Sequence, residues 1–247
     1  EIPSSIDLSP KFMCPFLKPP RTRMQKSWVH CPTKYTVIAF HTFKNHQWRY
    51  LMGIKLLPAF EKFVNDLRGI WSEFPDDETR MKRAHELMEK ELLPDPALRE
   101  HCKDWPSTEG RKNLLFYTDP DHGFVINGVV RVPGRTGSVH DHADGWVLYG
   151  LLDGTESLER FKAVESRKEE GYVKVELVSD TQGQAGKADL VPPYDIHAEQ
   201  GSDGRSVAVI LRSRVLVGEV LQGRYNRETG EYYEGSGPEQ IPYELSA

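Results

Sequence analysis

Between residues 112 and 220 the chain consists of short apolar runs separated by turn sequences, and this pattern restricts the fold more than any other feature. The apolar runs lie at residues 113–117, 124–132, 146–152, 172–177 and 207–220. Turn sequences containing Asp, Pro or Gly separate them, at residues 119–121, 133–134, 153–154, 182–183 and 203–204. Many short strands at such spacing are typical of an all-β sandwich or barrel. The sequence therefore predicts a mainly-β fold for this part of the chain.

The preceding region has a helical period. Apolar residues recur at steps of three and four between residues 60 and 74, and again between residues 81 and 92, which predicts two amphipathic helices. Pro75 ends the first helix and Asp76 or Asp77 can cap the second. Pro94 and Pro96 end the second helix, and a short helix is expected over residues 97–105. We expect this helical region to pack on the barrel.

Residues 1–50 contain six prolines, which interrupt any long helix or strand. Aromatic residues are dense there, whereas disordered tails are poor in aromatic residues. We therefore expect an irregular segment that wraps over a folded core. The expected domains are an N-terminal wrapping segment at 1–50, a helical region at 51–110, and a barrel with a C-terminal hairpin and tail at 111–247.

Charge and hydropathy exclude several classes of protein. With 32 basic and 37 acidic residues the net charge is −5, and a global electrostatic nucleic-acid binder would be basic. No run of 18 apolar residues is present, so we expect no membrane span. The first residues lack the features of a signal peptide, and the three cysteines form no Cys-x-x-Cys pair. We expect a cytoplasmic protein with reduced thiols.

The residues with the clearest chemical potential are His140 and His142. On a strand, residues i and i+2 point to the same face, so both imidazoles can reach one metal ion. A pair of surface or hydrogen-bonded histidines without a metal is the alternative. Asp141 must point to the opposite face, where it would serve structural hydrogen bonding rather than metal binding.

The residues around these histidines resemble the two motifs of the cupin superfamily. The first motif is similar to Gly134, the segment 140–142 and Gly154, and the second is similar to Gly186, Pro192 and His197. This resemblance implies a double-stranded β-helix, which is a jelly-roll barrel. It also supplies a third metal ligand, His197, on a later strand.

Two positions depart from these motifs. Val147 stands where the first motif usually has glutamate, and Tyr194 stands where the second often has glycine. The resemblance therefore implies a metal site made of three neutral histidines, namely His140, His142 and His197.

Over residues 60–235 the chain resembles a divergent member of the thiol dioxygenase family of cupins, which includes cysteine dioxygenase and 3-mercaptopropionate dioxygenase. The segment 140–150 is similar to the His-Asp-His strand and turn of that family, and the segment 224–230 is similar to its C-terminal hairpin. The family also has amphipathic helices before its barrel. The resemblance implies Fe(II) on three histidines, with open positions for substrate and O2.

Three features differ from the thiol dioxygenases. Val147 occupies the position of the cysteine that is cross-linked to tyrosine in animal cysteine dioxygenases. The hydrogen-bonding Ser, His and Tyr of the family correspond to Ala208, Ile210 and Arg212, so that relay is absent. The arginine that clamps the substrate carboxylate has its nearest counterparts at residues 111–113. Lys112 there would supply a charge without the bidentate fork of a guanidinium.

Arg212 lies on an otherwise apolar strand. A buried unpaired arginine is costly, so Arg212 is paired, exposed or directed into the pocket. We expect Arg212, with Lys112 or Arg111, to neutralise a substrate carboxylate. Trp146 has the same strand parity as the two histidines and is the aromatic candidate for the pocket, with simple core packing as the alternative.

The first hypothesis for function is a cytoplasmic non-haem Fe(II) dioxygenase that oxidises a small thiol- or carboxylate-bearing anion with O2. Imidazole also binds zinc, nickel and copper. The second hypothesis is therefore a three-histidine dioxygenase that cleaves carbon–carbon bonds, or a zinc or nickel lyase or isomerase. The third is a non-catalytic cupin that binds a small ligand. Apart from substrate and O2 we expect no nucleic-acid or membrane partner, and a monomer or homodimer.

Overall fold

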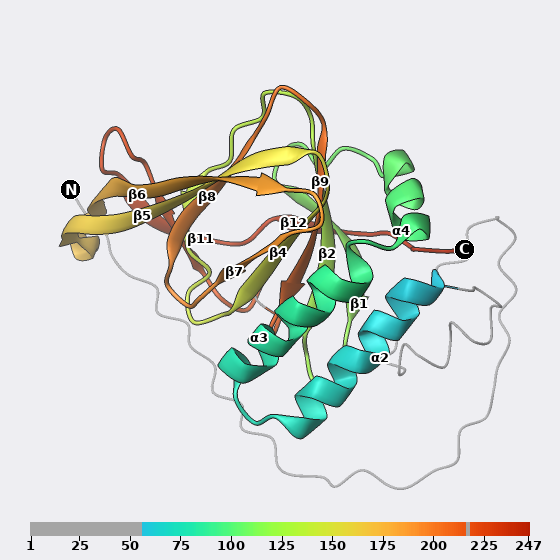
Figure 1. Cartoon of the computed structure of the whole chain (residues 1–247). Coiled ribbons are helices and arrows are strands. Elements are labelled where there is room, and N and C mark those ends of the chain that lie inside the picture. The colour runs from blue at the N-terminus through green and yellow to red at the C-terminus, as the bar shows by residue number, and fades with distance from the viewer. Residues whose placement is uncertain (1–55, 216–217) are drawn as a thin grey trace, which may run out of the picture. The chain divides into compact units, whose positions relative to one another are not determined.

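The computed structural model describes residues 56–215 and 218–247 (Figure 1). The wrapping segment expected over residues 1–50 lies outside these residues. The helices are α2 (Pro58–Glu73), α3 (Asp77–Leu87), which continues as one π-helical turn over Met88–Leu92, and α4 (Pro96–His101), which continues as a 3-10 turn over Cys102–Asp104. No helix in the described ranges is both long and apolar enough to cross a membrane.

The helices begin and end where the sequence predicts. Helix α2 starts at Pro58 and buries one apolar face, which includes Phe60, Phe63 and Trp71. The Asp76 side chain caps α3 by accepting a hydrogen bond from the Thr79 backbone N–H (2.8 Å). Such a cap stabilises the helix because it satisfies one of the backbone N–H groups that have no partner within the helix.

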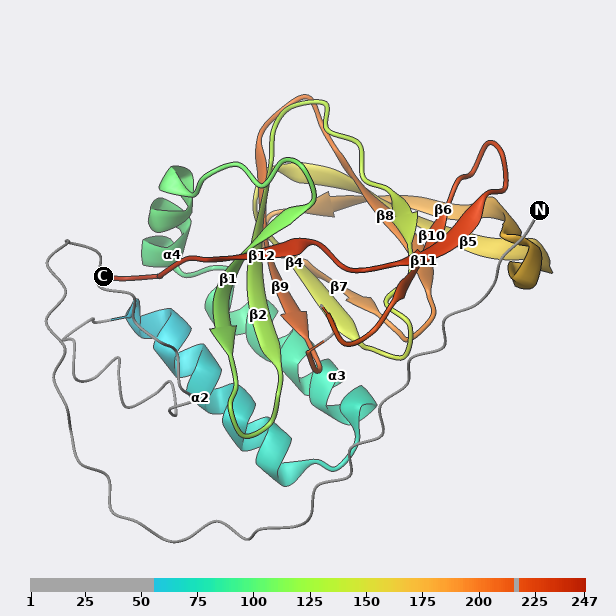
Figure 2. The same ribbon diagram turned by 180° about the vertical axis from the view of Figure 1, so that it is seen from behind.

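The strands form two six-stranded sheets. The first sheet has the order β12 (Glu239–Pro242), β1 (Lys112–Thr118), β2 (Val125–Arg131), β9 (Ser206–Arg212), β4 (Val147–Asp153) and β7 (Ala188–Val191). The second has the order β11 (Tyr232–Gly235), β10 (Gln222–Tyr225), β3 (Val139–His140), β8 (Ile196–Gly201), β5 (Thr155–Arg167) and β6 (Tyr172–Gln184). All pairs are antiparallel except β12 with β1, which run side by side in Figure 2. This arrangement confirms the expected mainly-β double-stranded β-helix.

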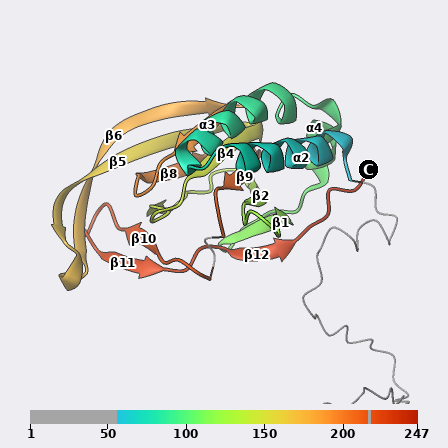
Figure 3. The same ribbon diagram turned by 90° about the horizontal axis from the view of Figure 1, so that it is seen from below.

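The helices cover the first sheet, on the side away from β10 and β11 (Figure 3). Alternate residues of β9 therefore meet different cores. Val207, Val209 and Leu211 pack with the helices in the larger core, while Ala208 and Ile210 pack inside the barrel. Because both faces of β9 are buried, its sequence is a continuous apolar run rather than an alternating one. Arg212 has the parity of Ala208 and Ile210 and so belongs to the inner face.

Two strand predictions need correction. The expected run at 207–220 ends as a strand at Arg212. The thirteen-residue strand β5 was not expected, because beyond Phe161 it is solvent-exposed and has no apolar face. It pairs with β6 from Thr155 opposite Gln184 to Arg167 opposite Tyr172. Hydrophobic periodicity cannot reveal the part of a strand that buries neither face.

Candidate metal centre

Three histidines from two neighbouring strands converge in the second sheet. His140 ends β3 and lies directly opposite His197 of β8 in the antiparallel register. His142 follows two residues after His140, just beyond the strand. The ring centroids are 4.4 Å apart for His140 and His197, and 4.8 Å apart for each of them and His142. The structure thus brings together the three residues predicted to be metal ligands, each offering one ligand nitrogen within 4.8 Å of the others.

Backbone hydrogen bonds orient two of the three rings. Nδ1 of His140 donates to the carbonyl oxygen of Ser138 (2.9 Å), and Nδ1 of His197 donates to the carbonyl oxygen of Asp195 (2.8 Å). A carbonyl oxygen can only accept, so in each neutral ring the proton is on Nδ1 and the Nε2 lone pair is free. Metal-ligating histidines are commonly fixed in this way. Burial, with the charge of neighbouring histidines, lowers the pKa of His140 and of His142 well below the ordinary value, which favours the neutral form that binds a metal.

Two nitrogens at this centre lack a hydrogen-bond partner within the described part of the chain. They are Nδ1 of His142 and Nε2 of His197, and both are buried. Nε2 of His197 faces Oε1 of Glu199 at 3.4 Å. A lone pair facing a carboxylate oxygen is repulsive unless a cation lies with them. A metal ion would satisfy both groups, so the donor set fits a divalent cation.

A cavity of about 240 Å³ opens beside His140 and His142. It is lined by Arg111, Lys112 and Arg212, the residues for which the sequence suggested a role in neutralising a substrate carboxylate. Arg212 is buried, its Nε donates to Oδ1 of Asn127 (3.3 Å), and its Nη1 has no partner among the residues described. Val147, where cupins usually have a glutamate, also lines the cavity.

Trp146 is not among the residues that line this cavity. Its side chain packs against the larger core on the helix side of the first sheet. The parity argument from His142 fails because Ala143 has a left-handed backbone (φ 50°), which interrupts the strand alternation before β4 begins at Val147. Val147 and Tyr149 face the cavity instead.

Sequence reasoning missed Glu199 and the arginines that accompany it. Glu199 is two residues after His197 on β8, so the same-face rule that pairs His140 with His142 would have found it. Arg131, Arg135 and Arg224 also line the cavity. Nothing local in the sequence shows that β10, which carries Arg224, pairs with β3.

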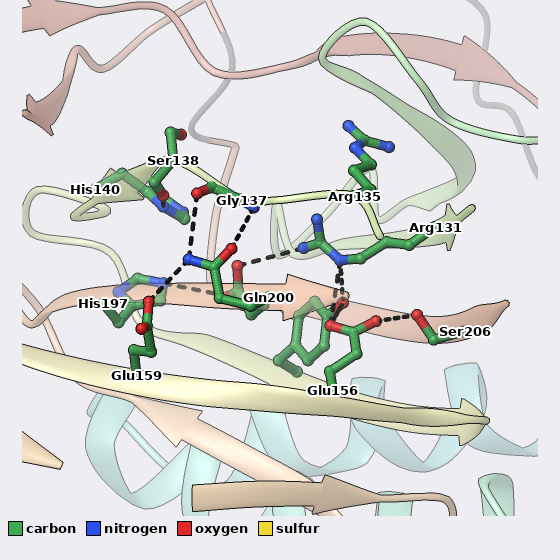
Figure 4. A network of polar contacts seen from close by, with 12 residues as sticks. Arg131, Arg135, Gly137, Ser138, His140, Glu156, Glu159, His197, Gln200 and Ser206 are labelled. Carbon is green, nitrogen blue, oxygen red and sulfur yellow. Dashed lines mark hydrogen bonds and ion pairs between the residues drawn. The ribbon is translucent and has the colours of Figure 1, made fainter. Parts of the chain in front are cut away.

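Glu199 belongs to a buried charge network, of which Figure 4 labels Arg131, Glu156 and Ser206. Nη2 of Arg131 lies 3.4 Å from Oε2 of Glu199, and Nε of Arg131 lies 3.2 Å from Oε2 of Glu156. Tyr149 and Ser206 donate hydroxyl hydrogen bonds to Glu156 (2.9 and 2.6 Å). Burial raises the pKa of Glu156. Burial also opposes the ionisation of Glu199, but its polar contacts, which include the permanent charge of Arg131, hold its pKa far below the ordinary value.

No protein-family model matches the sequence. One similar solved structure is an uncharacterized conserved protein with a double-stranded β-helix domain from Klebsiella pneumoniae, with 12% identity over 55% of this chain and 88% of that chain and a TM-score of 0.34. Another is KdgF from Halomonas sp., with 16% identity over 40% of this chain and 73% of that chain and a TM-score of 0.31. A recombinant oxalate oxidase in complex with glycolate is also similar, with 17% identity over 37% of this chain and a TM-score of 0.29. The match covers 42% of that protein, so this chain spans less than half of its length. The fold itself is established by the strand order of the two sheets, which is that of a double-stranded β-helix.

The turn after His140 is tied to the turn before His197. Asp141 points away from the histidines and accepts hydrogen bonds from the Ala143 and Gly223 backbone N–H groups and the Tyr225 hydroxyl (2.8, 3.1 and 2.6 Å). Its predicted structural hydrogen bonding is confirmed. The carbonyl oxygen of Ala143 then accepts from the backbone N–H of Tyr194 (2.7 Å). Tyr194 also has a left-handed backbone (φ 61°), which explains why the cupin motif favours glycine at that position.

The Asp141→Asn substitution is expected to weaken metal binding roughly 10–100-fold, the range for groups that orient metal ligands. An amide has one acceptor oxygen instead of two, so it can no longer accept hydrogen bonds from both the backbone N–H groups and the Tyr225 hydroxyl. The loop that carries His142 therefore loses one of the hydrogen bonds that hold it. Competition with a metal-binding dye measures the affinity. Asp203→Asn, in an exposed turn, removes the same charge and should leave the affinity unchanged. Equal affinities for the Asp141→Asn variant and the wild type would contradict the positioning role of Asp141.

Proposed function

We propose that this cupin is a non-haem Fe(II) dioxygenase that oxidises a small anionic substrate, bearing a thiol or a carboxylate, with O2. The observation that carries the proposal is the orientation of the histidines. The Nε2 atoms of His140 and His197 are both freed by hydrogen bonds at Nδ1, and His142 lies beside them. Among the described residues that line the adjoining cavity, six are arginine or lysine and one is glutamate, an excess of positive charge that suits an anionic substrate.

His140, His142 and His197 would hold the iron. Fe(II) bound by three neutral imidazoles keeps its full charge and open coordination positions, where it would bind an anionic substrate and O2. Zinc, nickel and copper accept the same ligands, so the metal must be measured.

The protein's own part in the reaction is to bind and orient the substrate. The free Nη1 of Arg212 can bind a substrate carboxylate, and Arg111 and Lys112 add positive charge where the cavity meets solvent. The same cavity has an apolar wall formed by Val129, Val147 and Ile210. This wall would exclude water from around the carbon atoms of the substrate. A charge-assisted contact in such a low-dielectric site is stronger than one in water.

A second candidate is a zinc or nickel lyase or isomerase, and Glu199 is the observation that favours it. A carboxylate 3.4 Å from Nε2 of His197 would lower the net charge of the centre, and zinc binds mixed histidine–carboxylate sets well.

Metal analysis followed by oxygen uptake tests these proposals. Protein expressed with iron, zinc and nickel all available is expected to contain close to one equivalent of iron. The iron-loaded protein should then consume O2 with 3-mercaptopropionate or cysteine, or with a diketone such as acetylacetone. Propanethiol, which has no carboxylate, is the matched control for 3-mercaptopropionate and should be slower.

Stoichiometric zinc or nickel that iron cannot replace would favour the lyase or isomerase instead. Iron without oxygen uptake on any of these substrates would contradict the dioxygenase. Protein that takes up no metal at all would leave a non-catalytic ligand-binding cupin.

A further inference from the structure

Two buried arginines in the cavity have no carboxylate partner within the described ranges. Arg212 is 3% exposed and Arg224 is 7% exposed. Arg212 donates to Asn127 (3.3 Å), while Arg224 donates to Oγ of Ser138 and Oε1 of Gln222 (3.3 and 2.7 Å). Nη1 of Arg212 and Nε of Arg224 are buried donors that have no acceptor among the residues described. Arg131, in the same cavity, is by contrast balanced by Glu156 and Glu199.

An uncompensated buried cation is unfavourable, and this cavity contains two. Burial lowers the pKa of Arg212 to about 10, and burial together with the nearby charge of Arg111 lowers the pKa of Arg224. Both side chains are nevertheless cations at neutral pH. Among the described residues, Glu199 is the one acidic side chain that lines the cavity, and Arg131 already contacts it. A ligand that carries negative charge would therefore compensate both arginines.

The two arginines approach the cavity from different sheets. Arg212 ends β9 in the first sheet, where it pairs with Val147 of β4. Arg224 lies on β10 in the second sheet, where it pairs with His140 of β3. Each guanidinium is held by its own polar neighbours, Asn127 for the first and Ser138 with Gln222 for the second. A ligand beside His140 and His142 therefore meets two separate guanidinium groups, each held in place by its own neighbours.

We propose that the ligand of this cavity is a small dicarboxylate, with one carboxylate bound by Arg212 and the other by Arg224. The inference rests on the proposed function in that the dicarboxylate would be the substrate, but its binding can be measured without turnover. An arginine fork matches a carboxylate in a bidentate manner, so two forks select for two carboxylates. A volume of about 240 Å³ suits a molecule of a few carbon atoms.

Isothermal titration calorimetry of the full chain tests this at low ionic strength. Malonate, succinate and glutarate are compared with butyrate, which has the four carbons of succinate but a single carboxylate, and with inorganic phosphate. The best dicarboxylate is expected to bind at least about tenfold more tightly than butyrate, because it gains a second charge-assisted contact. Arg212→Gln and Arg224→Gln should each weaken dicarboxylate binding by about tenfold or more, whereas butyrate should be affected by only one of them.

Arg227→Gln is the matched control, because Arg227 is half-exposed, pairs with Glu159 and does not line this cavity. Its dicarboxylate affinity should equal that of the wild type. The cavity variants should also remain folded, since each removes an unpaired buried charge, and they should melt at or above the wild-type temperature. A fall of more than about 4 °C, roughly 1–2 kcal/mol for a chain of this size, would show instead that these arginines are structural and would overturn the proposal.

Three further results would overturn it. In the first, succinate and butyrate bind with equal affinity and no other dicarboxylate binds more tightly. In the second, phosphate binds more tightly than any dicarboxylate. In the third, dicarboxylate binding is unchanged in both the Arg212→Gln and the Arg224→Gln variants. None of these depends on iron or oxygen. A protein that binds dicarboxylates through both arginines but consumes no O2 would contradict the dioxygenase and leave this inference standing.

Discussion

Replacing His197 with alanine is expected to abolish metal binding and every metal-dependent activity of the protein. His197 is fully buried, and its ring lies 4.4 Å from that of His140 and 4.8 Å from that of His142. Without it, the remaining two histidines lie close together in sequence and no histidine ligand comes from β8. Two imidazoles hold a divalent ion far less tightly than three, so the metal content should fall from about one equivalent to background.

Elemental analysis after desalting checks this result. His122→Ala is the control, because His122 lies in the turn after β1, where its Nε2 contacts Ser72 and not the other histidines. His197→Gln preserves more of the side-chain volume and separates loss of the ligand from loss of packing. If both His197 variants fold and retain a full equivalent of metal, the three-histidine centre is wrong.

The parts of this fold that the sequence predicts are those where burial leaves a pattern. Helix α2 shows its buried face because the other face meets water. Strand β9 shows an apolar run because the helices cover one face and the barrel interior the other. The same reasoning misses β5, whose outer half is exposed on both faces.

The candidate site was predictable only in part, for a different reason. His140 and His142 are close in sequence, so strand geometry alone pairs them, but His197 required the resemblance to the second cupin motif. Trp146 was misplaced because one left-handed residue, Ala143, resets the alternation. Arg224 depends on the pairing of β10 with β3 across more than eighty residues, and local sequence has no information about such a contact.

Replacing Arg131 with methionine should destabilise the protein by about 3–5 kcal/mol at neutral pH, the range found when one member of a buried ion pair is removed. Methionine is similar in length but carries no charge. Glu156 and Glu199 would then be left buried without a cation at 3.2 and 3.4 Å. Glu156 retains its hydrogen bonds from Tyr149 and Ser206, so most of the effect should come from the uncompensated charge.

Urea unfolding of chelator-treated protein measures the loss without any contribution from metal. Lys62→Met is the exposed control. Lys62 pairs with Asp66 and Glu91 on the surface, and its removal should leave the free energy of unfolding nearly unchanged, because exposed ion pairs contribute little. The double variant Arg131→Met with Glu156→Gln should be more stable than Arg131→Met alone, because one of the two stranded charges is gone.

The same measurement near pH 4 separates charge from packing. In the wild type the depressed pKa of Glu199 gives stability that is present above the unfolded pKa of about 4.3 and is lost as the pH falls. In the Arg131→Met variant the two stranded carboxyls would have raised pKa values, which destabilise the folded state at neutral pH and cease to do so once both are protonated. The two unfolding free energies should therefore converge as the pH falls. A difference that stays constant between pH 7 and pH 4 would mean that Arg131 acts through packing rather than through its charge.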